Sequence, residues 1–537
     1  MAIEKENRFK NIWNQIRYIN DKFPWYYYGL ILLVFSLPLT RFFTSVGQEI
    51  IILNWLINGN FKEKFALLKK QKNQLLIASI YLLHLLSLSY TSDFNWAFHD
   101  LIVKLPLLVL PVVIGTSPKL SKQRYLTVLN FFVGAVAFST FLSVLILIGV
   151  IHRDLSDIRE VVWEIAYIRL ALFINLVLCY LCYLTFFRKE KKILKFQIVR
   201  IALMFWFVLF LIFLKSGTGL IVLFILIIVF LIWKFKTTQN FLFRVTYLFI
   251  AIAIPLSVGL YLFNAIEKFY VADKIDFAKL PLTTINCNRY EHDTTQLLKE
   301  NGHYIWLFNC TYELKNAWNK RSLINFDSLD NKKQLIKYTA IRYLTSKNLT
   351  KDSLGVSKLS ASDISNIENG MANYIYQNKY DLYNRIYEVL WEIEFYRNGG
   401  NPAGHSLTQR IVYFKIGVDL IKTHFWFGIS AGDVKIAYEN AYKSLAFDFP
   451  EQFRLRAHNQ FQTFFISFGI IGFLWFMFAI LYPVLFQRKW NDWLFITFFI
   501  IVFISMFNED TLETQAGITF FAFFFAFYLQ TPDDLYN

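Results

Sequence analysis

Apolar segments long enough to cross a membrane recur through both ends of this 537-residue chain, and they restrict its fold more than any other feature. A transmembrane helix needs about 20 consecutive, mostly apolar residues. Hydrophobic residues make up 56% of the chain, which excludes a disordered protein and most soluble architectures. We therefore predict an all-α polytopic integral membrane protein with about 12 transmembrane helices and a large helical extracytoplasmic loop domain. The predicted helices cover residues 25–40, 43–58, 74–90, 101–116, 125–150, 170–187, 197–214, 219–233, 245–263, 458–486, 492–507 and 514–530.

The basic residues lie mainly on one side of these predicted helices. With the N-terminus in the cytoplasm, the six inside loops and tails before the last one hold 23 Lys and Arg residues, and the short outside loops and helix ends, apart from the long insert 264–457, hold six. Such an excess is typical of cytoplasmic loops. We therefore predict that both termini are cytoplasmic. The net charge of +16 then reflects membrane orientation and does not indicate a nucleic-acid partner.

Residues 264–457 interrupt the apolar pattern and divide the chain. They contain no apolar run of membrane length, and the predicted topology places them outside. We expect an N-terminal membrane domain of about nine spans at 1–263 and a C-terminal membrane domain of about three spans at 458–537. Residues 264–457 form the extracytoplasmic loop domain between them.

Two segments of the loop domain have the pattern of amphipathic helices, at 363–370 and 380–391. The Gly- and Asn-rich segment 398–404 is typical of a turn-rich linker. Cys287 and Cys310 lie in the same domain, where oxidation is permitted outside the cytoplasm. The sequence leaves open whether these two cysteines form a disulfide or stay reduced.

The segment Arg454-Leu-Arg-Ala-His-Asn459 places two arginines and a histidine at the start of the apolar run 458–486. Guanidinium groups match the geometry of phosphate oxygens, and the free N–H groups of a helix start attract anions. The same helix end disfavours an imidazolium, so that His458 can accept a proton. These side chains suit a base beside a group of anion-binding cations. The alternatives are arginines that only contact lipid headgroups and a histidine that only hydrogen-bonds a carbonyl.

The segment before that loop combines an amphipathic helix with an aromatic turn. Arg410 stands at the start of an apolar helical face that continues to about residue 421. Phe425-Trp-Phe-Gly428 is expected at the membrane interface, where aromatic side chains are favoured. Gly469 and Gly472 in the following apolar run would let a neighbouring helix approach closely.

Taken together, these features resemble the O-antigen ligase/polymerase superfamily. The resemblance rests on Arg410, the run Phe427-Gly-Ile-Ser-Ala-Gly-Asp433, Ala457-His458-Asn459 and Gly469-Ile-Ile-Gly472, and it is specific over about 405–486. It implies an all-helical glycosyltransferase of the bacterial inner (cytoplasmic) membrane with its large loop in the periplasm. Such an enzyme moves a glycan from undecaprenyl pyrophosphate to lipid A-core or to another glycan in lipopolysaccharide and polysaccharide biosynthesis. The implied transfer is inverting and needs no metal, nucleotide sugar or other cofactor.

The resemblance assigns two catalytic or binding roles by position. His458 matches the family's histidine, which activates or positions the acceptor hydroxyl, and Arg410 matches the loop arginine that holds the donor's diphosphate. A third family position, an arginine that follows a serine, corresponds to Gly217 in this chain. Lys215 is the nearby cation that would replace that arginine, without its bidentate grip on phosphate.

Further candidates for substrate binding follow from their place at the outer ends of the predicted helices. Arg169 either anchors its helix or contacts the donor. Lys104 and Lys215 lie at comparable depth on the same side, so convergent cations there would form a cradle for the diphosphate. The remaining candidates are Arg454, Arg456 and Asn459.

Three functions remain open on the sequence alone. A ligase that uses lipid A-core is slightly favoured over a polymerase, because one compact histidine-bearing loop is the clearest match. A lipid or polysaccharide transporter would place its ionisable residues near the bilayer midplane, whereas the candidate charges lie at outer helix ends. The expected partners are the lipid-linked donor, the glycan acceptor and membrane lipids. Asp100, Glu164 and Glu509 are carboxylates near the outer face that could position sugars, and the sequence singles out none of them.

Overall fold

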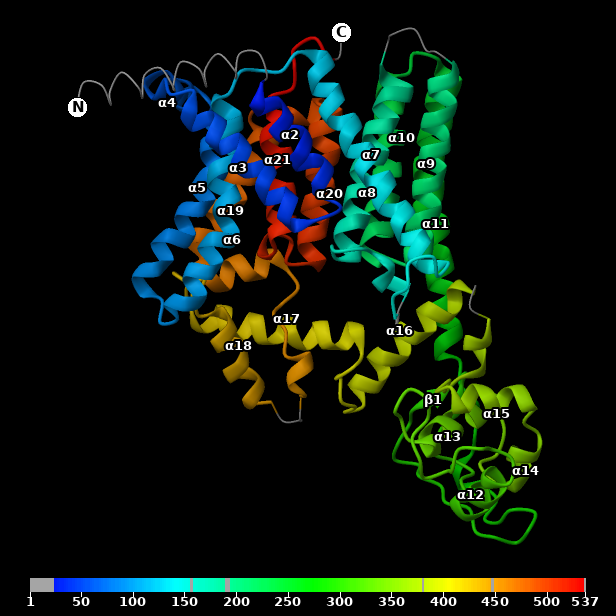
Figure 1. The fold of residues 1–537 in the computed structure, drawn as a ribbon. Coiled ribbons are helices and arrows are strands. Elements are labelled where there is room, and N and C mark those ends of the chain that lie inside the picture. The colour runs from blue at the N-terminus through cyan, green and yellow to red at the C-terminus, as the bar shows by residue number, and fades with distance from the viewer. Residues whose placement is uncertain (1–23, 155–157, 189–193, 379–380, 446–448, 536–537) are drawn as a thin grey trace. The chain divides into compact units, whose positions relative to one another are not determined.

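The structure is a computed structural model, mostly helical, with one pair of two-residue strands among the residues that it describes (Figure 1). The basic N-terminal tail, on which the predicted orientation partly depends, lies outside those residues. The structure describes residues 24–154, 158–188, 194–378, 381–445 and 449–535.

Eight helices of the described chain are long and apolar enough to cross a membrane. Three shorter apolar helices, α2 (Trp25–Ser36), α20 (Trp493–Asn508) and α21 (Gln515–Leu529), coincide with three more predicted spans. The predicted span 43–58 is the 17-residue helix α3 (Arg41–Ile57), so the total of about 12 spans stays a prediction. The eight long helices are α5 (Lys72–Ser87, continued to Tyr90), α6 (Phe94–Thr116), α7 (Lys122–Leu147), α8 (Tyr167–Cys182, continued to Phe187), α9 (Leu194–Leu214), α10 (Gly217–Thr237), α11 (Phe241–Tyr270) and α19 (Gln460–Leu485).

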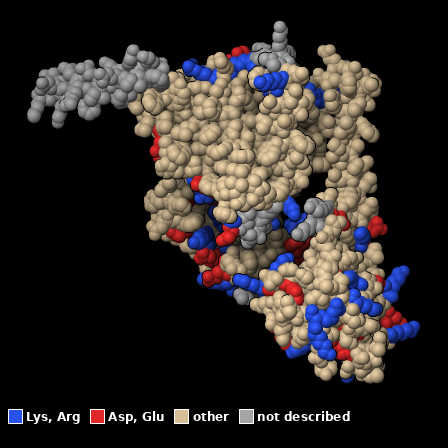
Figure 2. All heavy atoms as spheres, turned by 45° about the vertical axis from the view of Figure 1, so that its right-hand side comes forward, with Lys and Arg blue, Asp and Glu red and all other residues tan. Residues whose placement is uncertain are grey.

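The first of two compact units is a helical bundle built around α21. It comprises the described residues up to Thr237, together with Tyr413–Ser444 and the residues from Arg454 onward. α21 is apolar on all sides, and its residues Phe520–Tyr528 are all buried, as expected for a helix at the centre of a bundle. α21 contacts α6 and α20, and α5 contacts α6 and α19. The bundle presents a broad surface with few charged side chains in Figure 2, which suits contact with lipid.

The second unit comprises Thr238–Val412 and Leu445–Phe453. After α11, its chain forms a small helical body with a core of its own, which includes the fully buried side chains of Trp318, Phe326 and Tyr343. The two strands of this body pair antiparallel. Its elements are η4 (Phe277–Lys279), β1 (Lys299–Glu300), β2 (His303–Tyr304), α12 (Thr311–Asn319), α13 (Ile336–Ser346), α14 (Ser353–Ser357), α15 (Ala361–Glu368), η5 (Tyr374–Gln377) and α16 (Leu382–Arg397).

Both amphipathic helices predicted for this region are confirmed, as α15 and α16. α15 begins at a capping box in which Ser360 and Asp363 bond each other's backbone N–H groups. The turn-rich segment 398–404 separates α16 from α17 (Ser406–Thr423), as predicted.

The two cysteines of the loop domain are both free thiols. Cys287 is exposed and Cys310 is buried at the start of α12. The disulfide that the sequence left open is therefore not formed in the structure.

Candidate active site

The loop Arg454–Asn459 leads into α19 and carries four of the predicted site residues. Asn459 caps the helix, because its Oδ1 accepts the backbone N–H of Gln462 at 3.0 Å. Its Nδ2 donates to the carbonyl of Phe507 at 3.1 Å. A cap of this kind satisfies one of the free N–H groups at a helix start. Both ends of the Asn459 amide thus serve the protein's own structure.

His458, one residue before this cap, has its backbone in the left-handed region, with φ at 49°. Such a conformation costs a residue other than glycine about 1–3 kcal/mol and is concentrated at functional sites. The His458 ring centroid lies 5.8 Å from that of Tyr413, and Nδ1 lies 4.0 Å from Glu509 Oε2. That distance exceeds a hydrogen bond, so the Glu509 carboxylate lies near the imidazole without bonding it directly. The side chain keeps 29% of its surface exposed, so a substrate hydroxyl can reach it.

α17 packs against the first turns of α19 and so brings Tyr413 to His458. Gln462 Nε2 donates to the carbonyl of Phe414 at 2.8 Å. A Cβ at Gly417 would lie 2.5 Å from the Gln462 side chain, so this approach requires glycine. The amphipathic helix predicted from the sequence therefore positions one wall of the site.

Arg456 belongs to a buried cluster of charged residues centred on Glu513, in η8 (Thr511–Glu513). Arg456 Nη1 lies 3.2 Å and Lys104 Nζ 2.8 Å from Glu513 Oε2. Gln460 Nε2 donates to Glu513 Oε1 at 3.0 Å. We call Glu513, Lys104 and Arg456, with the Asp100–His84 pair described below, the Glu513 cluster.

The cluster is held together by opposite charges. Burial by itself raises the pKa of Glu513, but Lys104 and Arg456 outweigh it and lower that pKa to about 2. Burial lowers the pKa of Arg456, whereas the carboxylates of Glu513 and Asp510 raise it, and the net shift is upward. Glu513 and Arg456 therefore remain an ion pair at neutral pH.

Lys104 is fully buried, and its ammonium is occupied by internal partners. Besides Glu513, it contacts the carbonyl of Leu512 at 2.8 Å and Asp100 Oδ1 at 3.4 Å. The other Asp100 oxygen lies 2.7 Å from His84 Nδ1. Lys104 was expected to contribute to a cradle for the diphosphate. In the structure its side chain is buried and its ammonium contacts Glu513, Asp100 and the Leu512 carbonyl, so it is not exposed to a ligand.

Arg169 is also buried, with 5% of its surface exposed, but it is incompletely paired. Its Nη2 donates to the carbonyl of Asp510 at 3.1 Å. Its Nη1 has no hydrogen-bond partner among the described residues. A buried donor without a partner is costly, so an anionic ligand at this position would remove the cost.

These contacts converge on the loop 508–513 between α20 and α21. The loop approaches His458 through Glu509, and it is tied to α10 because Asn508 Nδ2 donates to Thr218 Oγ1 at 2.6 Å. The sequence reasoning noted Glu509 without singling it out and missed the rest of this loop. The sequence did contain a signal for this loop, namely the three acidic residues Glu509, Asp510 and Glu513 between two apolar runs. Charges beside a membrane need partners, so their presence indicates contacts with cations.

Lys215 lies between α9 and α10, exposed and with φ at 50°. The described residues include no salt-bridge partner for its ammonium. Gly217, where the family pattern has an arginine, opens α10, and a Cβ there would meet nothing within 4 Å. An arginine would fit in this position, and the exposed ammonium of Lys215 is two residues away.

The two remaining predicted arginines are less closely defined. Arg410 lies on α17 in the part that belongs to the second unit, three residues before Tyr413. Arg454 is half-buried at the start of the loop before α19. Both side chains make contacts within the protein, and their roles in binding substrate stay predictions.

The run Phe427–Asp433 of the family pattern forms a structural clamp. The Oγ of Ser430 donates to Asp433 Oδ2 at 2.9 Å. The Asp433 carboxylate also accepts the backbone N–H groups of Ser92 and Asp93, each at 2.9 Å. These residues fix the turn before α6 to the turn before α18 (Val434–Lys443), so their part in the pattern is structural.

α19 is kinked at Gly469, where φ is 64°, and the turn Phe425–Gly428 packs into the kink. The N–H of Ile470 donates to the carbonyl of Phe425 at 2.8 Å. A Cβ on Gly469 would lie 2.2 Å from the carbonyl oxygen of Trp426. At Gly469 the partner of the predicted close approach is this turn and not a neighbouring helix, whereas a Cβ on Gly472 would lie 3.8 Å from Leu83 of the neighbouring helix α5. The kink frees backbone groups of α19 to bond the turn.

Comparison with known proteins gave a match to a family model. Residues 369–477 match the family model for O-antigen ligase. A comparison with curated proteins gave no match. The matched segment includes His458 and the kink of α19, and it supports an O-antigen ligase-like superfamily. With the long apolar helices, it supports a multi-pass membrane enzyme of the O-antigen ligase and polymerase type.

Proposed function

We propose, from the premise that residues 369–477 belong to the O-antigen ligase family, that this chain is an inverting glycosyltransferase of the bacterial inner membrane. It takes a glycan from undecaprenyl pyrophosphate and transfers it to a sugar of lipid A-core, as an O-antigen ligase. Its loop domain faces the periplasm, and both termini face the cytoplasm. The observation that carries the proposal is His458, held in a left-handed backbone 4.0 Å from Glu509.

The reaction is a single displacement at the anomeric carbon of the donor. The imidazole of His458 accepts the proton of the acceptor hydroxyl while that oxygen forms the new glycosidic bond. The bond from the anomeric carbon to the diphosphate breaks, and the carrier leaves as undecaprenyl pyrophosphate. Attack opposite the leaving group inverts the anomeric configuration. Glu509 stabilises the imidazolium that His458 becomes.

The leaving diphosphate carries growing negative charge, and several cations are available to it. Arg169 offers an Nη1 without a partner among the described residues, and Lys215 offers an exposed ammonium. Arg456 keeps 27% of its side chain exposed while it pairs with Glu513. Guanidinium groups bind phosphate oxygens in pairs and strengthen as charge develops. Arg410 and Arg454 are proposed to add contacts from the loop.

The same geometry would serve a polymerase, because both reactions use a diphosphate donor and a hydroxyl acceptor. Gel electrophoresis of glycolipids from a deletion strain separates the two. Loss of long glycan on lipid A-core, with polymerised donor accumulating, indicates a ligase. Core capped with a single repeat unit indicates a polymerase.

The deciding variant in that strain is His458→Gly. Glycine adopts the left-handed region readily, so this change removes the imidazole without straining the backbone. We expect complementation by the wild-type gene and loss of transfer with His458→Gly. Arg488→Gly is the matched control, because Arg488 is an exposed residue with φ at 53° beyond the other end of α19. Normal glycan with His458→Gly at equal protein level would reject the proposed role.

A further inference from the structure

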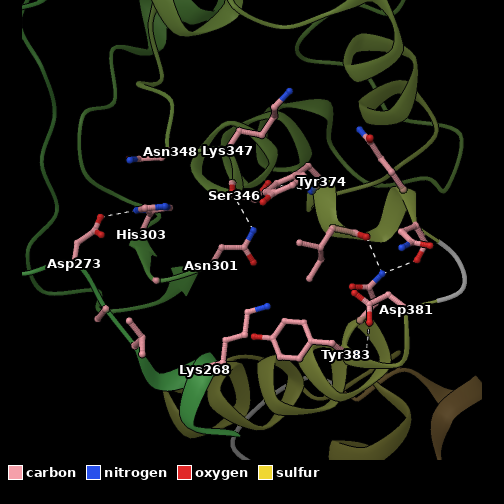
Figure 3. Close-up of a pocket in the computed structure, with 17 residues that line it drawn as sticks. Lys268, Asp273, Asn301, His303, Ser346, Lys347, Asn348, Tyr374, Asp381 and Tyr383 are labelled. Atoms are coloured by element: carbon pink, nitrogen blue, oxygen red, sulfur yellow. Dashed lines mark hydrogen bonds and ion pairs between the residues drawn. The ribbon is translucent and has the colours of Figure 1, made fainter. Parts of the chain in front are cut away.

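A cleft of about 1040 Å³ lies in the second unit (Figure 3). None of its lining residues takes part in the proposed transfer reaction. It is lined by the end of α11, the β1–β2 turn, the end of α13, η5 with the following Asn378, and Asp381 with the first turn of α16. Binding cavities of about 300–1,000 Å³ hold ligands of drug size. The cleft therefore has room for a ligand larger than a single sugar.

A hydrogen-bonded network surrounds Glu300, whose side chain is completely buried, and it reaches the lining residue Asn301 through Asn373 and Tyr387. The Glu300 carboxylate receives bonds from Arg342 Nε at 2.7 Å, Asn373 Nδ2 at 2.6 Å and Tyr387 Oη at 3.0 Å. A buried polar network that is fully satisfied makes its surroundings rigid. The walls of the cleft are thus held in place before any ligand arrives.

Two lining residues adopt the left-handed backbone, Asn301 with φ at 51° and Asn348 with φ at 56°. The Asn301 amide is used by the protein, since its Nδ2 donates to the carbonyl of Ser346 at 2.9 Å. The Asn348 side chain is exposed and has no hydrogen-bond partner among the described residues. A strained turn therefore presents a free amide, with both donor and acceptor capacity, at the cleft.

His303 and Tyr374 also line the cleft. His303 Nδ1 is bonded to Asp273 Oδ2 at 2.5 Å, which fixes the ring and leaves Nε2 for a ligand. Tyr374 keeps 41% of its surface exposed and offers an aromatic face and a hydroxyl. An amide, an imidazole nitrogen and an aromatic face are therefore available together.

Among the described residues that line the cleft, the positive and negative charges are equal in number. The lining holds two lysines, Lys268 and Lys347, and two aspartates, Asp273 and Asp381. Lys347 is paired with Asp363 at 2.8 Å outside the lining, and the Lys268 ammonium lies 4.2 Å from the Tyr383 ring centroid. The described lining residues include no arginine, so they do not supply the planar guanidinium that binds phosphates and carboxylates through paired hydrogen bonds. The chemistry favours an uncharged ligand rich in hydroxyl groups.

From these features we propose that the cleft binds a neutral oligosaccharide. A sugar presents hydroxyl groups that both donate and accept, as amide and imidazole groups require, and an apolar C–H face that packs on an aromatic ring. The binding site itself does not depend on the transfer reaction. Its identification with the glycan of the donor or of the acceptor rests on the proposed function.

Binding is tested directly with full-length protein in nanodiscs. The probes are an array of defined neutral and acidic oligosaccharides, together with the long-chain glycan and the core oligosaccharide released from the source bacterium by mild acid. We expect neutral chains of several sugars to bind and inorganic pyrophosphate not to compete. Stronger binding of the long-chain glycan assigns the cleft to the donor side, and stronger binding of the core assigns it to the acceptor side.

Two variants connect binding to the cleft. Tyr374→Ala removes the aromatic face, and Asn348→Gly removes the free amide while it keeps the left-handed backbone. Each is expected to weaken binding about tenfold. The matched controls, Tyr312→Ala and Lys333→Gly, change an exposed tyrosine and an exposed left-handed residue of the same body outside the cleft.

The outcomes separate this proposal from the proposed function. His458→Gly should bind oligosaccharide at the wild-type level although it transfers none. The proposal is overturned if no glycan binds, if pyrophosphate or acidic glycans displace the neutral ones, or if Tyr374→Ala and Asn348→Gly bind like their controls.

Discussion

The Glu513 cluster and the cleft in the second unit both contain or adjoin buried carboxylates, but the partners of those carboxylates differ. In the cluster, each carboxylate faces a cation, and Lys104 alone contacts Asp100, Glu513 and a carbonyl. Beside the cleft, Glu300 pairs with Arg342 and also accepts hydrogen bonds from the neutral side chains of Asn373 and Tyr387. The groups that remain available to a ligand are the Asn348 amide, the His303 imidazole and the Tyr374 phenol. In the Glu513 cluster, paired charges hold the helix ends in place. At the cleft, neutral hydrogen-bonding groups remain available for the proposed uncharged ligand.

Lys104→Met tests this difference with the largest expected effect, a loss in the free energy of unfolding. It leaves Asp100 and Glu513 without their shared cation, and removing one partner of a buried pair costs about 3–5 kcal/mol. The unfolding midpoint of the purified protein, followed by tryptophan fluorescence, measures the loss. Lys268→Met is the matched control at the cleft, where an exposed ammonium over a ring is worth about 0.5–1 kcal/mol. Equal losses for the two variants would contradict the distinction between the sites.

The pH dependence of stability should depend on Glu513. Its pKa of about 2 in the folded protein lies below the ordinary value of about 4.3. Its contribution is therefore complete above the ordinary value and is lost as the pH falls towards about 2. The wild-type protein should be more stable than Glu513→Gln at neutral pH, and the difference should shrink between about pH 5 and pH 2. A difference in midpoint that stays constant over this range would show that the carboxylate is not held by its cations.

The smallest effect is expected from an added cation. Gly217→Arg places a guanidinium at the start of α10, where the position is open, beside the exposed Lys215. One further charged contact to the donor should raise kcat/KM for transfer roughly fivefold, measured with purified enzyme and lipid-linked donor. Gly217→Gln is the control, because it adds bulk and hydrogen bonds without charge. Equal rates for both variants would place the diphosphate away from α10.

Much of the fold could be predicted from the sequence, because the signals are local. Long apolar runs gave the membrane helices, and the Ser360 and Asp363 pair that begins α15 is a start signal within four residues. The kink of α19 could not be predicted in the same way. A glycine such as Gly469 does not indicate by itself whether a helix or a turn packs against it. The turn at Phe425, which does so here, lies far away along the chain.

The position of His458 and Arg456 could be predicted, because both stand in the loop before the apolar run that forms α19, whereas their roles stay predictions. The roles of their partners could not be predicted, because pairing depends on which helix ends meet in space. Lys104 has the appearance of a candidate phosphate ligand until Glu513 and Asp100 are placed beside it. The cleft was missed for a related reason, since Asn348, His303 and Tyr374 form no motif along the chain.

The central claim is that His458 performs proton transfer while a glycan leaves its lipid diphosphate. The direct measurement uses purified protein in liposomes with an undecaprenyl-pyrophosphate-linked glycan and lipid A-core acceptor, and follows product by gel electrophoresis. The wild-type and Arg488→Gly proteins should form product at equal rates, and His458→Gly should be slower by about 10²–10⁴-fold, as loss of a general base predicts. Transfer by His458→Gly at the wild-type rate would contradict the account.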